Sequence, residues 1–142
     1  MRVLGAAPAS DHVALVVLEV SAEGWTVVDT SATRKIGIGD HEDPRNLHDF
    51  KDAVSAFINS YGVEKLIIRR CTYRGQKRSG AASIKMETLL QLLPCASELV
   101  PPQSISRRLE QHGAQFPSEL TRYQEHAFAA ALWALDPDAD AV

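Results

Sequence analysis

A run of positively charged side chains is the part of this sequence best suited to chemistry. Residues 69–85 contain six cations and no acid, so this span carries +6 in a chain of net charge −3 and leaves −9 on the remainder. Guanidinium and ammonium groups bind phosphate oxygens, and a nucleobase could stack on the interleaved Tyr73. The pattern predicts a phosphate or nucleic-acid contact, with a solvated loop that balances the acidic remainder as the alternative. The six cations are Arg69, Arg70, Arg74, Lys77, Arg78 and Lys85.

Two more arginines, Arg107 and Arg108, follow a Pro-Pro pair later in the chain. Ligands of open α/β sheets bind at the carboxyl ends of the strands, so both arginines could join the basic segment at one rim. Alternatively, an arginine at a strand end pairs with a carboxylate. The candidate partners are Asp11, Asp29 and Glu125.

Other potential ligands are scattered. The acidic run 40–43, with His48 and Asp49 beyond it, has metal-ligand residue types. No second half of a site is identifiable, so an exposed acidic loop before a helix is the favoured interpretation. His126 could be a ligand or a proton carrier, but a hydrogen-bonded structural histidine is favoured.

The two cysteines, Cys71 and Cys95, match no metal-binding spacing, which is typical of a reducing compartment. Because Cys71 follows two arginines, its pKa could be lowered. A buried or half-buried thiol without special reactivity is the favoured alternative.

Composition bounds the class of protein. A chain of 142 residues that is 45% apolar predicts one globular domain over residues 1–142. No apolar run approaches the roughly 20 residues that cross a bilayer, and the first residues lack the organisation of a signal peptide. We therefore expect a cytoplasmic protein, without membrane partners, whose net charge gives no overall attraction to nucleic acid.

The first half of the chain predicts strands over residues 2–6, 12–20 and 25–30, rich in β-branched side chains. Short links favour an antiparallel meander, since parallel pairing needs a longer connection. A loop is expected over residues 34–45. A helix should follow, capped by Asn46 and ended by the glycine at position 62.

The second half alternates strands and helices, which is typical of crossover units. The last helix carries an alanine stripe over residues 127–134, which favours close packing on the sheet over a dimer face. The expected elements are a strand over 63–68, a loop over 69–80, a helix over 81–93, a strand over 97–100, a short helix capped by Ser104, a last helix capped by Ser118 and a frayed tail over 136–142.

This order predicts an α/β fold with a mixed five-stranded sheet, in which three antiparallel strands precede two parallel crossovers and helices cover both faces. The chain resembles the RNase H-like superfamily, nearest to its RuvC-like branch. The resemblance rests on residues 1–9 as first strand and turn, 66–70 as fourth strand, 100–108 as fifth-strand exit and 125–134 as closing helix. The sequence also resembles a small bacterial family of uncharacterised proteins built in this way.

The resemblance implies four carboxylates that hold two divalent cations. At the positions that match, this chain has Ala7, Arg69, Tyr123 and His126, with Glu125 one residue away. A guanidinium stays protonated, and at about 4 Å in an effective dielectric near 20 it repels each unit of positive charge by roughly 4 kcal/mol. We therefore expect no metal cofactor and no two-metal nuclease activity at this degenerate pocket.

Three functions follow as hypotheses. The leading one is a catalytically silent RNase H-like domain that serves as a binding or scaffolding module. The second is a nuclease whose acids are displaced to Asp11, Asp29 and Glu125. The third is a protein that binds nucleic acid or phosphate through the basic segment without cutting it. A homodimer is compatible with the sequence, but no stretch specifies its interface.

Overall fold

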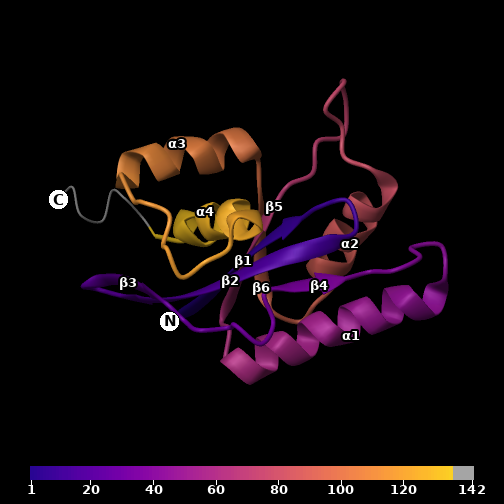
Figure 1. Ribbon diagram of the computed structural model, residues 1–142, viewed down its shortest axis with the longest axis horizontal. Helices are drawn as coiled ribbons and strands as arrows, with labels where there is room; N and C mark the ends of the chain where they lie inside the picture. Colours follow the sequence, from indigo (N-terminus) through magenta and orange to yellow (C-terminus); the bar gives the residue numbers. More distant parts are fainter. Residues whose placement is uncertain (136–142) are drawn as a thin grey trace.

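A long hairpin forms the centre of the sheet. Strands β1 (Arg2–Pro8) and β2 (His12–Ser21) are antiparallel, and they pair along the whole length of β1. On the other side of β1, the strands β5 (Lys65–Arg69) and β6 (Ala96–Val100) add in parallel. The computed structural model describes residues 1–135. Along the main path of its sheet, the strand order is β3-β2-β1-β5-β6 (Figure 1).

The outer edge of β2 is shared by two short strands. β3 (Gly24–Val27) pairs with its C-terminal half, and β4 (Lys35–Gly37) pairs with its N-terminal half. The predicted loop over 34–45 is therefore wrong at its start, and the sheet has six strands rather than five. β4 escapes sequence analysis because it has only three residues and exposes both its ends.

Alternating side chains of the strands build a core on each face of the sheet. Leu4 and Leu66 face α1 and α2, whereas Val3 and Ile67 face α3 and α4. Figure 1 shows α1 and α2 on one side of the sheet and α3 and α4 on the other. The helices are α1 (Pro44–Tyr61), α2 (Ala81–Gln91), α3 (Pro102–His112) and α4 (Glu125–Trp133), with a short 3-10 turn η1 (Arg122–Gln124) before α4. The predicted mixed sheet with helices on both faces is confirmed.

Helix α4 packs unusually close to β1. A Cβ atom added to Gly5 would lie 2.0 Å from the carbonyl oxygen of Ala127 and 2.9 Å from the Cβ of Ala131. Only a glycine on the strand and small residues on the helix allow this approach. The alanine stripe therefore packs against the sheet, as favoured from the sequence.

Several predicted boundaries move for local reasons. Asp43 rather than Asn46 caps α1, because Pro44 fits the first helical position. The short helix predicted from Ser104 begins at Pro102 for the same reason. The last helix starts at Glu125, not after Ser118, because residues 113–121 form a loop before η1. The predicted third strand ends at residue 27 instead of 30, and the predicted tail over 136–142 lies outside the described residues.

Within residues 1–135, none of the helices has the length and apolar character needed to cross a membrane.

Candidate functional site

The carboxyl ends of β1 and β5 bring the first two predicted pocket residues together. Ala6 pairs with Ile68, so the next residues along these parallel strands, Ala7 and Arg69, lie side by side at the edge of the sheet. Ala7 belongs to the core shared with α4. Because side chains alternate along a strand, Arg69 faces the same side as Ile67, toward α4. We call this edge, with the loops that leave it, the rim.

His126, another predicted pocket residue, lies in the first turn of α4, which packs on this face of the sheet. Partial desolvation and the nearby Arg69 guanidinium lower the pKa of His126, although the Glu125 carboxylate acts in the opposite direction. Burial also lowers the pKa of Arg69. Arg69 and His126 thus lie within electrostatic range of each other, so the charges near His126 include a permanent cation. A carboxylate ring around metal ions would present the opposite potential.

Tyr123 lies toward β2 and β4 instead. Its ring packs edge-on against His12 with centroids 6.0 Å apart, and the Lys35 ammonium lies 5.0 Å from its centroid. His12 in turn makes a 2.6 Å contact from Nδ1 to the Asp11 carboxylate. Tyr123 therefore belongs to an aromatic and charged cluster on the β2 side of the rim.

The three acids of the displaced-acid hypothesis have separate surroundings. Hydrogen bonding to His12 lowers the pKa of Asp11, and the backbone N–H of Ser31 lowers the pKa of Asp29. Glu125 is exposed on the first turn of α4. Among residues 1–135, no three histidine, cysteine, aspartate or glutamate side chains form a group that could hold a metal ion. The structure does not assemble Asp11, Asp29 and Glu125 into one site.

Between β5 and α2, the basic loop (residues 70–80) has a defined conformation. The Ser79 amide donates to the Thr72 carbonyl at 2.6 Å, and the Thr72 amide donates to the Ser79 hydroxyl at 3.0 Å. At the tip, the Arg78 guanidinium donates to the carbonyl of Gly75, which has a φ of 92° that favours glycine. The loop is therefore a closed turn, with Arg74 and Lys77 exposed on it.

A buried carboxylate anchors this loop, and the sequence analysis missed it. Glu87 on α2 is only 3% exposed. Its carboxylate accepts a 2.6 Å hydrogen bond from the Cys71 amide and a second from the Tyr73 hydroxyl. Ser83, one turn earlier on the same buried face of α2, donates to the Ala9 carbonyl in the β1–β2 turn. The helical spacing of buried Ser83, Met86 and Glu87 was the available signal.

The rim cations differ in what they contact. Arg70 lies at the base of the loop, with its Cζ atom 6.0 Å from the centroid of the Tyr73 ring. The ion pairs formed within residues 1–135 involve none of the cations at the rim. These cations are Arg69, Arg70, Arg74, Lys77 and Arg78.

Three of the predicted binding cations have other surroundings. Lys85 donates to the His41 carbonyl at 3.0 Å, in the loop that precedes α1. Arg108 donates to the Trp133 carbonyl at 2.5 Å, and its guanidinium lies 3.7 Å from the indole centroid, at the C-terminal end of α4. Arg107 is exposed on α3. The structure therefore gives Arg108 a packing role away from the rim.

Cys71 is not activated by its arginine neighbours. It is buried, and burial together with the Glu87 carboxylate raises its pKa to about 12. The possibility that Arg69 and Arg70 lower this pKa is wrong, because desolvation and an anion outweigh the cation. The favoured alternative of a buried thiol is confirmed, and both cysteines are free.

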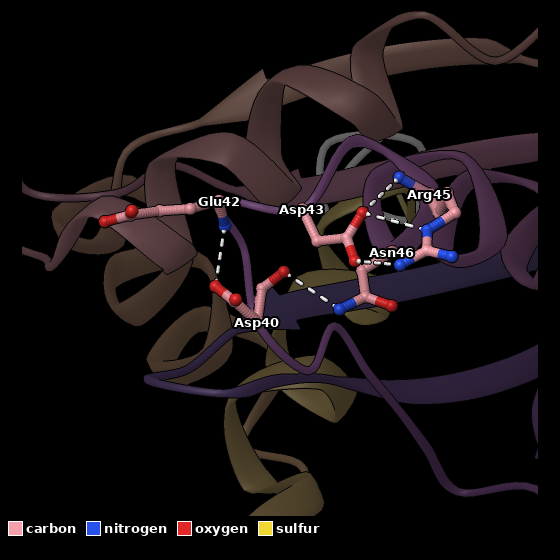
Figure 2. Close-up of polar contacts among 5 residues, drawn as sticks. All are labelled: Asp40, Glu42, Asp43, Arg45 and Asn46. Atoms are coloured by element: carbon pink, nitrogen blue, oxygen red, sulfur yellow. Dashed lines mark hydrogen bonds and ion pairs between the residues drawn. The ribbon is translucent and has the colours of Figure 1, made fainter.

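Two aspartates of the acidic loop (residues 40–43) hydrogen bond to backbone amides two residues later in the chain, as Figure 2 shows. The Asp40 side chain accepts from the Glu42 amide, and its carbonyl accepts from the Asn46 side chain, both at 3.0 Å. The Asp43 carboxylate caps α1 through the Arg45 amide and also pairs with the Arg45 guanidinium at 3.1 Å. The favoured interpretation, a loop that starts a helix, is confirmed.

The solved structures with a similar fold include RuvC and a Holliday junction resolvase. Thermus thermophilus RuvC has a TM-score of 0.69 at 14% identity, over 94% of this chain and 92% of that chain. The same protein in complex with a Holliday junction substrate has a TM-score of 0.66. The yeast mitochondrial Holliday junction resolvase Ydc2 has a TM-score of 0.56 at 10% identity, over 92% and 78% of the two chains. These similarities confirm the predicted RNase H-like fold of the RuvC type.

The sequence places the chain more narrowly. It belongs to the family described as "Protein of unknown function (DUF3010)", whose model matches residues 1–134. Among proteins with curated functions, none matches this sequence significantly.

Proposed function

We propose that this chain is a non-catalytic RNase H-like domain that binds nucleic acid through the rim. The observation that carries the proposal is the set of cations at the rim, which form no ion pair within residues 1–135. Thermus thermophilus RuvC, which has a similar fold, has been solved in complex with a Holliday junction substrate. A nucleic-acid backbone supplies the phosphates that such a surface binds.

The composition of the degenerate pocket supports binding without cleavage. Two-metal catalysis needs carboxylates that hold the ions. At the matching positions, Ala7 offers a methyl group and Arg69 a permanent positive charge. An arginine here attracts the phosphate that a metal ion would otherwise hold, but it generates no hydroxide nucleophile.

The basic loop supports contact with unpaired bases as well as phosphates. Tyr73 is 49% exposed, while its hydroxyl is held by the buried Glu87. A fixed aromatic ring among cations suits stacking with an unpaired base, which contributes about 1–3 kcal/mol per base in single-strand binding proteins. We therefore expect single strands and branched junctions to bind more tightly than plain duplexes.

A salt-dependent binding assay tests the proposal. Fluorescence anisotropy measures the binding of a labelled single strand, a duplex and a four-way junction, in buffer that contains EDTA. The affinity should fall steeply between about 50 and about 200 mM salt. The variant Arg74→Gln/Lys77→Gln should lose about tenfold in affinity, and the slope of log affinity against log salt should become shallower by about 2. Arg78 stays unchanged because it holds the turn of the loop.

The matched control removes the same charge elsewhere. Lys51 lies on α1, and Lys65 starts β5 at the end opposite to the rim. Lys51→Gln/Lys65→Gln should leave the salt slope almost unchanged. No binding at low salt, or equal losses in the two variants, would overturn the proposal. Cleavage of any of these substrates after addition of Mg²⁺ or Mn²⁺ would overturn its non-catalytic part.

A further inference from the structure

A groove of about 410 Å³ lies between the basic loop and the start of α3. Arg70, Tyr73 and Arg74 line one side, and Pro102 and Gln103 line the other. The residues that line it include no acid. The residues that line this groove include neither Arg69 nor His126.

Two guanidinium groups supply the hydrogen-bond donors of the groove. The Nε atom of Arg70 is buried and has no hydrogen-bond partner within residues 1–135. A buried donor without a partner costs free energy. Arg74 adds a second guanidinium, and no side chain caps the first turn of α3 beside Gln103.

The number of donors decides which phosphate fits. An internal phosphodiester offers two free oxygens and one negative charge, which a single arginine fork can satisfy. A phosphomonoester offers three acceptor oxygens and a charge of about −1.5 to −2 at neutral pH. Two guanidinium groups in one groove match the larger acceptor set.

We propose that this groove binds the phosphomonoester at the end of a nucleic-acid strand, with Arg70 and Arg74 as its ligands. The inference rests on the proposed function, because the rest of the strand must lie along the rim cations. It assigns to the domain a preference for phosphorylated strand ends, in addition to general affinity for phosphate backbone.

Oligonucleotides of one sequence with a 5′-phosphate, a 3′-phosphate or only hydroxyl ends test the inference in the anisotropy assay. One phosphorylated form should bind roughly tenfold more tightly than the hydroxyl form. Arg70→Gln should abolish this preference, and Arg70→Lys should weaken it because an ammonium lacks the guanidinium fork. Lys77→Gln, outside the groove lining, should lower affinity for all three oligonucleotides and keep the preference.

Each outcome separates the two proposals. Equal affinity for all three oligonucleotides would overturn this inference and leave the proposed function standing, whereas absence of any binding would overturn the proposed function itself. Loss of the preference in Lys77→Gln as well as Arg70→Gln would also overturn the groove assignment. Calorimetry with inorganic phosphate tells a strand end from a free phosphate as the ligand. If free phosphate bound saturably and as tightly as the phosphorylated strand, the assignment to a strand end would be overturned. Thermal unfolding of Arg70→Lys checks that the loop stays folded.

Discussion

Two charged loops precede the two helices on the same face of the sheet, and they use their charges in opposite ways. In the acidic loop before α1, the Asp40 and Asp43 carboxylates each accept a hydrogen bond from the backbone amide two residues later (Figure 2). In the basic loop before α2, the exposed Arg74 and Lys77 form no ion pair within residues 1–135. Both segments look like charge runs in the sequence, but two aspartates of the acidic one are engaged with backbone amides, whereas Arg74 and Lys77 of the basic one extend into solvent.

The two loops also differ in what holds their backbone. The acidic loop is held mainly by side chains of residues 40–46, with one bond from the Lys85 ammonium to the His41 carbonyl. The basic loop has internal bonds between Thr72 and Ser79, and a carboxylate on the buried face of α2 anchors its base. A surface that must meet an anionic ligand cannot keep an exposed acid among its cations, since the acid would repel the ligand. Placing the acid at Glu87, beneath the loop, orders the cations without neutralising their outer surface.

The largest effect on folding should come from removing this buried anchor. Glu87→Ala leaves the Cys71 amide and the Tyr73 hydroxyl without an acceptor, which should lower the free energy of unfolding by about 3 kcal/mol. Glu87→Gln keeps one acceptor oxygen and should cost less. Chemical denaturation measures both values, and hydrogen exchange at the Cys71 amide should accelerate in Glu87→Ala before global unfolding.

Thr88→Ala is the matched control for this change. Thr88 is the next residue of α2, it is exposed, and its hydroxyl bonds only to the helix carbonyl of Ile84. It should change the free energy of unfolding by less than about 0.5 kcal/mol. If the two alanine variants were equally stable, the external anchoring of the basic loop would be refuted.

A smaller effect is expected at the acidic loop. Asp43→Ala removes the α1 cap and should lower Tm by about 3 °C, because the Arg45 amide then has only solvent as its hydrogen-bond partner. Affinity for nucleic acid should stay the same. Asp43→Asn keeps a capping oxygen and should restore most of the Tm, while Glu42→Ala, whose side chain is exposed, serves as control. A marked change of binding in Asp43→Ala would mean that the two loops act as one site.

The sequence predicted the fold well where patterns are long. Nine residues of β-branched and apolar character revealed β2, and helical spacing up to Gly62 revealed α1. It failed at β4, whose three residues are fixed by pairing with β2 rather than by their own pattern. The Gln124 side chain, which donates to the Leu15 carbonyl at 2.9 Å, is buried by tertiary contact that no local signal encodes.

The site was predictable in its cations but not in their surroundings. The position of Arg69 at a strand end follows from the apolar run before it, and its place beside Ala7 follows from parallel pairing with β1. The sequence could not tell that Arg108 turns toward Trp133, since that contact joins residues 25 apart on different helices. The sequence gives the number of charged residues, whereas the fold determines which of their side chains remain accessible.

The smallest expected effect is on thiol reactivity, and it tests whether the Glu87 charge acts on Cys71 beneath the basic loop. With a pKa near 12, Cys71 has a thiolate fraction at pH 8 of about 10⁻⁴, so alkylation should be slow and should rise with pH through 9. Cys95 is partly exposed and should react first. In Glu87→Gln the anion beside Cys71 is gone, so its pKa should fall and its alkylation should accelerate severalfold, while Cys95 keeps its rate. Mass spectrometry of each labelled peptide measures the two rates. An unchanged Cys71 rate would mean that burial alone, rather than the Glu87 charge, sets the chemistry beneath the basic loop.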